Sequence, residues 1–283
     1  MKAQKRIAAI HDISGLGKCS LTVALPVISA AGIECSVMPT AVLSTHTGGF
    51  TGFTFRDLTD DLLPFAEHWK SNGFRFDAIY TGYLGSTKQI DIVKEIFDMI
   101  ADEDTLIISD PAMADYGRMY ALFDMEFAKG MAGLCKKADI VVPNFTEAAF
   151  MLGEEYVAPP YDKAYVEGLI KRLSDMTGGD AVLTGVQFSD DGIGAASYSR
   201  ADGEVKYAIS DKLEGSYHGT GDVFASVLTA AVVSGRSLAD AAELAVRFTR
   251  DCIARTLADP DLSRRYGVNF EGGLGGLASE LAK

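Results

Sequence analysis

Four-fifths of the way along this chain lies the run His218-Gly219-Thr220-Gly221-Asp222-Val223-Phe224-Ala225-Ser226, which opens a long apolar helical pattern. Its two glycines let backbone N–H groups converge on an anion at a helix N-terminus. The carboxylate of Asp222 stands beside them as a candidate base for a hydroxyl. Phosphoryl transfer needs both a site for developing phosphate charge and such a base, so this run indicates that chemistry.

Composition sets the limits for every later inference. The chain has 283 residues, 48% of them hydrophobic, which allows a sizeable core in one large α/β domain or two smaller ones. No apolar run approaches the ~20 residues of a membrane span. The four cysteines form no CxxC pair, which indicates reduced thiols in a cytoplasmic protein. The net charge of −13 argues against a nucleic-acid partner, whereas a nucleotide could bind through metal ions or helix N-termini.

Short β-rich runs alternate with amphipathic segments along the chain. The expected strands, most of them apolar on both faces, are Ile7–Ile10, Cys35–Met38, Ala78–Tyr80, Leu106–Ser109, Ile140–Val142 and Ala181–Thr184. The expected helices are Cys19–Ala31, Leu58–Lys70, Thr87–Ala101, Phe123–Lys137, Thr146–Leu152, Ala164–Met176, Thr220–Val233, Leu238–Thr256 and Leu274–Leu281. This alternation predicts an α/β fold with a doubly wound, mostly parallel central sheet flanked by helices on both faces. Since no linker divides the chain, we expect a single domain over residues 1–283.

Two segments break this rhythm. Residues Thr40–Arg56 are rich in Thr, Gly and Phe and have no helical period, so we expect a small flap or a hairpin over a site. The stretch Ile193–Ile209 has Asp202-Gly203 at its middle, a dipeptide typical of tight hairpin turns. We therefore expect paired strands at Ala195–Ser199 and Glu204–Ile209.

Polar residues stand at the ends of the expected strands, where sheets of this kind bind ligands. They are Asp12 and Ser14 after the first strand, Tyr83 after the third, Asp110 after the fourth, Asn144 and Glu147 after the fifth, and Thr184 at the sixth. Acidic residues on one edge suit a Mg²⁺-nucleotide site, so Asp110 and Glu147 are candidates for metal-linked roles. Each has a simpler alternative: Asp before Pro is often a turn residue, and Glu147 could be a first-turn helix acid.

Other catalytic motifs fail on spacing. A P-loop ending at Gly17-Lys18 would need Gly at position 12 and Ser or Thr at position 19, where the chain has Asp12 and Cys19. No histidine pair has the HExxH spacing of zinc hydrolases, and no GxSxG elbow is present. For His46, in the expected flap, contact with a ligand and capping of a turn both stay open.

Several stretches resemble one family. The run His218–Ser226 matches the GTGD anion-hole motif of the ribokinase-like superfamily, and Asp110–Asp115 resembles DPVMGD. Pro143–Glu147 is similar to PNxxE, Thr81–Gly85 to SGYLGS, and Ser44–Gly48 to SNHTxx. Together these motifs make nearly the whole chain resemble the vitamin B6 branch, the pyridoxal/pyridoxine/pyridoxamine kinases.

The resemblance implies ATP-dependent phosphorylation of the 5′-hydroxymethyl group of a B6 vitamer, giving the 5′-phosphate and ADP in the salvage of pyridoxal 5′-phosphate. Asp222 would be the base that activates this hydroxyl. Gly219, Thr220 and Gly221 would supply N–H groups to the γ-phosphate. The resemblance also implies a cytoplasmic homodimer with no nucleic-acid or membrane partner.

The remaining roles divide between nucleotide and acceptor. By the same resemblance, Asp110 and Glu147 would organise Mg²⁺ against the phosphates of ATP, and Asn144 and Thr184 would face those phosphates. The pocket for the small heteroaromatic alcohol would be lined by Asp12, Ser14, Thr47, Tyr83 and Asp222, with Tyr83 against the ring. Whether a monovalent cation is also needed stays open.

Some positions depart from the family pattern. The first-strand motif is His11-Asp12-Ile13-Ser14-Gly15 rather than SHVxYG, which is closer to the hydroxymethylpyrimidine kinases. Thr184 stands where some relatives have Lys, which removes one positive charge. Two alternatives therefore accompany the B6 kinase: a hydroxymethylpyrimidine (phosphate) kinase of thiamine synthesis, and a non-catalytic protein that binds B6 vitamers.

Overall fold

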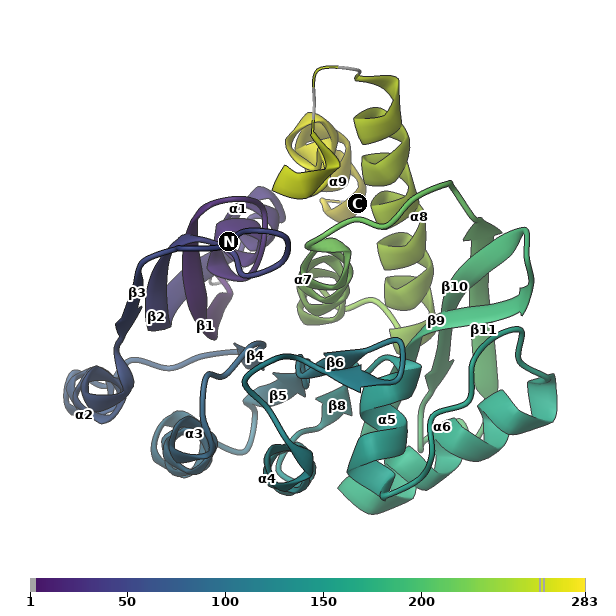
Figure 1. Ribbon diagram of the computed structural model, residues 1–283. Helices are drawn as coiled ribbons and strands as arrows, with labels where there is room; N and C mark the ends of the chain where they lie inside the picture. The colour runs from purple at the N-terminus through teal and green to yellow at the C-terminus, as the bar shows by residue number, and fades with distance from the viewer. Residues whose placement is uncertain (1–3, 260, 262, 283) are drawn as a thin grey trace.

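The computed structural model describes residues 4–259, 261 and 263–282 (Figure 1). Across these residues a nine-stranded sheet runs in the order β11-β10-β9-β8-β5-β4-β1-β2-β3. Its strands are β1 (Arg6–Leu16), β2 (Glu34–Thr45), β3 (Phe55–Asp57), β4 (Ala78–Thr81), β5 (Leu106–Ser109), β8 (Ile140–Val141), β9 (Asp180–Ser189), β10 (Gly192–Tyr198) and β11 (Val205–Asp211). Strands β2, β1, β4, β5, β8 and β9 pair in parallel, and antiparallel pairs occur only towards the two edges of this sheet.

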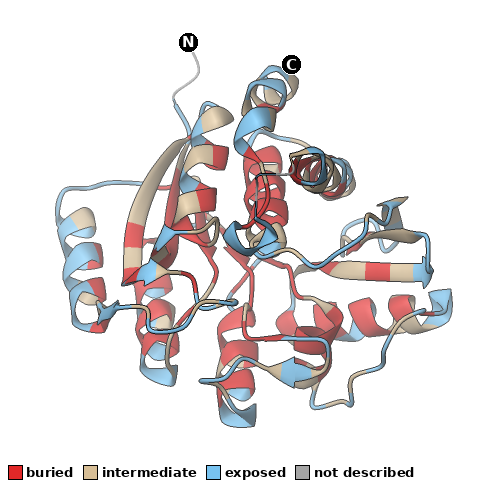
Figure 2. Cartoon of the chain, turned by 45° about the horizontal axis from the view of Figure 1, so that its top comes forward, coloured by how far each residue is buried: buried red, intermediate tan, exposed pale blue. Residues whose placement is uncertain are grey.

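Helices cover both faces of the sheet. One face carries α2 (Leu62–Ser71), α3 (Thr87–Ile100), α4 (Met125–Cys135), α5 (Phe145–Leu152) and α6 (Lys163–Thr177). The other carries α1 (Leu21–Ala30), α7 (Thr220–Val233), α8 (Leu238–Ala258) and α9 (Leu274–Leu281). Figure 2 shows buried residues on the sheet-facing sides of most of these helices and exposed residues on their outer sides, whereas α7 is buried nearly all round. The predicted α/β architecture is therefore confirmed.

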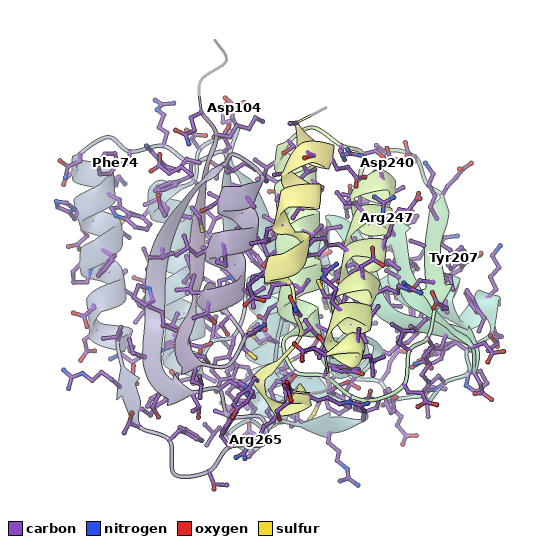
Figure 3. All side chains as sticks on the ribbon, turned by 90° about the horizontal axis from the view of Figure 1, so that it is seen from above. Phe74, Asp104, Tyr207, Asp240, Arg247 and Arg265 are labelled. Carbon is purple, nitrogen blue, oxygen red and sulfur yellow. The ribbon has the colours of Figure 1, made fainter. Side chains whose placement is uncertain are left out.

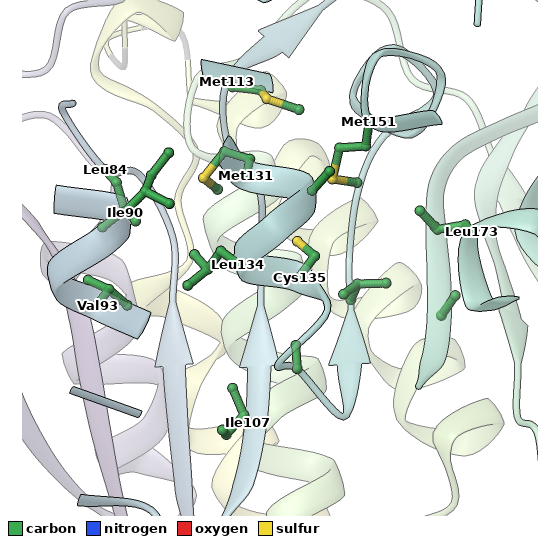
Figure 4. Close-up of a cluster of buried hydrophobic side chains, with 14 of the residues drawn as sticks. Leu84, Ile90, Val93, Ile107, Met113, Met131, Leu134, Cys135, Met151 and Leu173 are labelled. Carbon is green, nitrogen blue, oxygen red and sulfur yellow. The ribbon is translucent and has the colours of Figure 1, made fainter. Parts of the chain in front are cut away.

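The two faces bury separate apolar clusters. Figure 4 shows part of the first, where Leu84 and Ile90 lie beside Met131 and Leu134 above the strands. The second packs α7, which is almost entirely buried, against the sheet and its neighbouring helices. Close packing of this kind makes α7 a rigid support, because each large side chain removed from such a core costs ~2–5 kcal/mol.

Strands β1 and β2 extend well beyond the predicted Ile7–Ile10 and Cys35–Met38. Their pairing continues from Arg6 opposite Glu34 to Leu16 opposite Thr45, with one irregularity between His11 and Ile13. Asp12 and Ser14 therefore lie within β1, not after it. Thr184 lies inside β9 rather than at its end, because β9 continues to Ser189. The prediction was wrong because polar and glycine residues have low strand propensity, whereas pairing with a neighbouring strand keeps this backbone extended.

The segment Thr40–Arg56 forms a hairpin. It consists of the second half of β2, a connecting turn and β3, with Ala41 opposite Asp57. A second predicted hairpin is also present, as β10 and β11. The small hairpin of β6 (Ala114–Asp115) and β7 (Arg118–Met119) was not predicted, because strands this short leave no periodic pattern.

Shorter elements complete the described chain. Single 3₁₀ turns occupy Thr59–Asp61, Arg264–Tyr266 and Glu271–Gly273. Among the residues described, no helix combines the length and the apolar character that crossing a membrane would require.

Candidate active site

Helix α7 begins with free backbone donors. Its first internal hydrogen bond runs from the N–H of Val223 to the carbonyl oxygen of Gly219, at 2.9 Å. The N–H groups of Thr220, Gly221 and Asp222 precede that bond, so none of them has a partner inside the helix. Together with the positive end of the helix dipole, they form a site suited to an anion.

Gly219 shapes this turn. Its backbone has φ +75°, in the left-handed region, and a Cβ at this position would collide with the carbonyl oxygen of Lys18. Lys18 is in turn fixed by a 2.8 Å hydrogen bond from its N–H to the carbonyl oxygen of Tyr266. Only glycine therefore allows the start of α7 to approach the loop after β1 this closely.

The carboxyl group of Asp222 sits in the first turn of α7 and is partly buried. Its pKa is raised to about 7, first by burial and also by the nearby charge of Asp12, while the backbone of Ser20 acts in the opposite direction. A group with a pKa near neutrality suits general base catalysis, because it is available as the base and can also return the proton.

Asp12 and its hydroxyl partners occupy the middle of β1. The Oδ1 atom of Asp12 accepts a hydrogen bond from Ser20 Oγ at 2.5 Å, and Oδ2 accepts one from Ser14 Oγ at 3.3 Å. Burial raises the pKa of Asp12, against the effect of these hydrogen bonds. Tyr83 lies close enough for the charge of Asp12 to act on it, and burial first, then that charge, raise its pKa to about 12.

Asp110 is a buried carboxyl group without a donor. Burial raises its pKa well above the ordinary value, and the charges of Glu147 and Asp222 raise it further. Within the described residues, no side chain or backbone N–H donates a hydrogen bond to this carboxylate. A buried anion in this position is costly unless a cation or a proton accompanies it.

Glu147 belongs to a capping box at the start of α5. The side chain of Asn144 accepts a hydrogen bond from the N–H of Glu147 at 3.0 Å, and Glu147 Oε2 accepts one from the N–H of Asn144 at 2.9 Å. Glu147 Oε1 accepts a third from the N–H of Met113 at 3.1 Å. Burial nevertheless raises the pKa of Glu147 to about 8. Glu147 therefore does serve as the first-turn acid of α5, the simpler role considered for it. This role does not exclude a second one towards a metal ion.

The two other candidate phosphate contacts lie side by side. Asn144 and Thr184 are joined by a parallel backbone bridge between the start of α5 and β9. The Asn144 side chain also donates to the carbonyl oxygen of Ala114 at 2.8 Å, so most of its hydrogen-bonding capacity is used within the protein. The Thr184 hydroxyl donates to the carbonyl oxygen of Pro143 at 3.4 Å.

The tip of the β2–β3 hairpin packs against the segment around Arg265, which is labelled in Figure 3. The Arg265 guanidinium lies 4.0 Å from the centre of the Phe50 ring, and His46 Nε2 lies 2.9 Å from the Arg265 carbonyl oxygen. His46 Nδ1 accepts a hydrogen bond from the N–H of Gly48 at 3.1 Å, so this ring caps a turn. Thr47, the remaining candidate pocket residue, is exposed at the hairpin tip.

The structure therefore brings the four predicted carboxyl groups within electrostatic reach of one another. The charge of Asp12 acts on Asp222, and the charges of Asp222 and Glu147 act on Asp110. Sequence reasoning missed Ser20, whose hydroxyl bonds to Asp12 and whose backbone lowers the pKa of Asp222. Its only sequence signal is a serine before a helix, which predicts an ordinary N-terminal cap.

The sequence profile of one family, described as phosphomethylpyrimidine kinase, matches residues 24–264. The chain belongs to this family. Phosphomethylpyrimidine kinases and pyridoxal kinases are members of the ribokinase-like superfamily, so the superfamily assignment made from the motifs is confirmed. The family also establishes that the chain is a kinase of the pyridoxal kinase and hydroxymethylpyrimidine kinase group, which implies a nucleotide and a small alcohol as substrates.

Two relatives of this phosphomethylpyrimidine kinase family member match over most of its length. The hydroxymethylpyrimidine/phosphomethylpyrimidine kinase of Bacillus subtilis is 28% identical over 220 residues, covering 77% of this chain and 78% of that protein. The thiamine biosynthetic bifunctional enzyme of Arabidopsis thaliana is 26% identical over 237 residues, or 81% of this chain, and the match spans 42% of its own length.

Two crystal structures are more similar. A proposed phosphomethylpyrimidine kinase from Bacteroides thetaiotaomicron, crystallised with pyridoxal, has 38% identity and a TM-score of 0.92, covering 97% of this chain and 96% of that one. Pyridoxal kinase from Lactobacillus plantarum has 31% identity and a TM-score of 0.90, covering 98% and 97%.

Proposed function

We propose that this kinase transfers the γ-phosphoryl group of ATP to the 5′-hydroxymethyl group of a B6 vitamer. The observation that carries this is the start of α7, where free backbone N–H groups and a carboxyl group with a pKa of about 7 share one helical turn. Pyridoxal in the crystals of the 38% identical Bacteroides protein supports the choice of acceptor. Cytoplasmic location and a homodimer stay predictions from the family resemblance.

The reaction follows from these groups. Asp222 accepts the proton of the acceptor hydroxyl while that oxygen bonds to the γ-phosphorus, and the bond from phosphorus to the β-phosphate oxygen breaks to release ADP. An aspartate is a weak base for an alcohol, so proton transfer comes late and positioning provides much of the rate. The N–H groups of Thr220 and Gly221 stabilise the charge on the transferred group.

The residues near Asp110 fit a magnesium ion that arrives with ATP. Asp110 is buried, and no group among the described residues donates a hydrogen bond to its carboxylate. Burial, and then repulsion from the charge of Glu147, make the ionised form of Asp110 less favourable. Over the same residues, no group of three or more acidic, His or Cys side chains is placed to bind a metal ion. Magnesium held by one or two carboxylates, water and phosphates matches that arrangement. When bound, it would neutralise charge on the phosphates.

Replacing Glu147 by Gln tests this assignment. We expect E147Q to need ~10-fold more Mg²⁺ for half-maximal turnover, because one carboxylate near the phosphates is lost. We also expect a loss of ~1–3 kcal/mol in unfolding free energy, since the amide oxygen of Gln can accept from the N–H of Asn144 or of Met113 but its NH2 group cannot accept from the other. Titrating Mg²⁺ at fixed ATP checks the prediction, and an unchanged Mg²⁺ dependence would make the metal-linked role of Glu147 wrong.

The main competing function is phosphorylation of hydroxymethylpyrimidine or its phosphate, favoured by the family profile and by the Bacillus relative. Both acceptors are planar heteroaromatic alcohols, so one pocket could accept either. A third possibility is binding of a vitamer without catalysis. The intact base and anion-binding turn argue against it.

A substrate panel decides between these functions. The protein is incubated with ATP and Mg²⁺ and with pyridoxal, pyridoxine, pyridoxamine or hydroxymethylpyrimidine, and ADP release and product mass are measured. We expect the highest kcat/KM with a B6 vitamer and a product heavier by one phosphoryl group. A preference for the pyrimidine would establish the alternative, and binding without ADP release would establish a non-catalytic role.

A further inference from the structure

Ser20 has a backbone conformation that residues with a side chain rarely adopt. Its φ is 54° and its ψ is −131°, at the junction between the loop after β1 and helix α1. Among the described residues, Tyr116 is the one other non-glycine residue with positive φ. Such strain persists where surrounding contacts over-determine the backbone, and it gathers at functional sites.

The side chain of Ser20 is also diverted from its usual role. A serine at the start of a helix normally accepts a hydrogen bond from an N–H of the first turn. The Ser20 hydroxyl accepts none and instead donates to Asp12 Oδ1 at 2.5 Å. Helix α1 is begun by the Ser20 carbonyl oxygen, which accepts hydrogen bonds from the N–H groups of Val23 and Ala24 at 3.0 and 2.9 Å.

The loop that carries Ser20 also approaches a second carboxyl group. The start of α7 lies against Lys18 and Cys19, just before Ser20, and the Ser20 backbone lowers the pKa of Asp222 and so favours its charged form. Because Asp12 and Asp222 repel each other when both are charged, a residue that is bonded to Asp12 and also favours the charged form of Asp222 can influence how both carboxyl groups are placed. An antiparallel backbone bridge between Ile13 and Ser20 ties this residue to β1.

We propose that Ser20 is a positioning residue for phosphoryl transfer, which fixes the carboxyl groups of Asp12 and Asp222 relative to each other through its hydroxyl and its backbone amide. The inference rests on the proposed function only in that it takes Asp222 to be the base.

The surrounding groups simplify the expected pH behaviour. The titratable groups on neighbouring elements that the charge of Asp222 or Asp12 reaches are Cys19, Tyr80, Tyr83, Asp110 and Tyr120. Burial raises the pKa of the Cys19 thiol and of the Tyr80, Tyr83 and Tyr120 phenols above their ordinary values. These groups therefore stay neutral near pH 7, and carboxyl groups dominate the titration there.

Two variants remove the hydroxyl with opposite effects on strain. Ser20→Ala keeps a side chain in the strained conformation, whereas Ser20→Gly relieves the strain. We expect both to lower kcat/KM by ~10–100-fold, because the reacting groups are no longer held in place. Loss of a donor raises the pKa of Asp12. A neutral Asp12 no longer opposes ionisation of Asp222, so the acid limb of the kcat/KM profile moves to lower pH.

Thr22→Val is the matched control. Thr22 lies in the first turn of α1, and its hydroxyl donates to the carbonyl oxygens of Gly17 and Cys19 at 3.2 and 2.7 Å, with no hydrogen bond to either carboxyl group among the described residues. We expect its pH profile to match that of the wild type even if the loop is less stable. If Thr22→Val moves the acid limb as far as Ser20→Ala does, loop order alone explains the effect and the proposal is overturned.

A readout independent of turnover completes the test. Carbon NMR of the protein labelled in its aspartate carboxyl groups, with signals assigned from Asp12→Asn and Asp222→Asn, follows both titrations directly. We expect both Ser20 variants to raise the pKa of Asp12 and lower that of Asp222. Unchanged titrations, or wild-type kcat/KM in Ser20→Gly, would overturn the proposal. If the wild type phosphorylates no acceptor, the proposed function fails, while the NMR titration still decides the role of Ser20.

Discussion

Asp222→Asn is expected to lower kcat by ~10²–10⁴-fold while the affinity for ATP changes little. Asn has almost the same shape as Asp, but its amide group cannot take up the proton of the substrate hydroxyl near neutral pH. The helix of which it is part is packed on all sides, so the backbone N–H groups that would bind phosphate should stay in place. Steady-state kinetics with saturating ATP and the best acceptor of the panel would measure the loss.

The pH dependence follows from the same carboxyl group. Since burial raises the pKa of Asp222 to about 7, kcat/KM should rise with pH through that value as the base ionises. In Asp222→Asn the residual activity should lack this limb. Near-normal turnover in the variant, or an unchanged acid limb, would rule out Asp222 as the base.

Asp222→Asn should also stabilise the protein above neutral pH. An aspartate in the unfolded chain ionises near pH 3.8, so between that pH and about 7 the folded state binds more protons than the unfolded one. Stability therefore falls as pH rises through this window. The penalty is fully present above it, and discounted for partial exposure it amounts to ~1–3 kcal/mol.

Thermal unfolding at two pH values distinguishes the role of Asp222 as a buried base from a role in capping α7. If Asp222 is a buried base, the gain in Tm of Asp222→Asn over the wild type should be larger at pH 8 than at pH 5. If Asp222 only capped α7, its removal as Asp222→Ala would cost ~1 kcal/mol at either pH and leave activity intact.

Gly219→Ala is expected to have the second large effect. A Cβ at Gly219 would collide with the Lys18 carbonyl oxygen, and the left-handed backbone penalises any side chain. The start of α7 must then move away from the loop after β1. We expect a loss of ~1–3 kcal/mol in unfolding free energy and a fall in kcat of ~10²–10³-fold, similar to losing a donor from an oxyanion hole.

Gly235→Ala provides a control for backbone strain alone. Gly235 follows α7 and has φ +101°, but nothing lies within 4 Å of a Cβ built there. This variant should lose ~1 kcal/mol of stability with kcat unchanged. Equal activity losses in the two variants would show that the contact between Gly219 and Lys18 has no special role in catalysis.

The fold could be predicted to the extent that local patterns are strong. Helices α7 and α9 have the bounds expected from the sequence, because apolar periodicity and glycines at their starts mark them clearly. The expected helix from Cys19 begins later, at Leu21, because the Ser20 backbone leaves the helical region. That conformation depends on contacts with distant residues, so no local pattern reveals it.

The candidate site divides in the same way. The identities of Asp110, Glu147 and Asp222 could be inferred from motifs and from their places near strand and helix ends. Their pKa values could not, because these depend on burial and on charges brought together from separate elements. Nor could the sequence show that Glu147 is bound to the backbone of Asn144 and Met113.

The sequence by itself determined an α/β kinase architecture, because alternating apolar runs and a glycine-rich helix start depend only on nearby residues. Tertiary structure alone decided that Asp12 lies inside an extended β1, with its carboxylate bonded to Ser20 and its charge acting on Asp222. Pairing of β1 with β2 and packing of α7 against the loop after β1 produce that arrangement. Both involve residues far apart in the chain, and the electrostatics that tune Asp222 arise only when those residues meet.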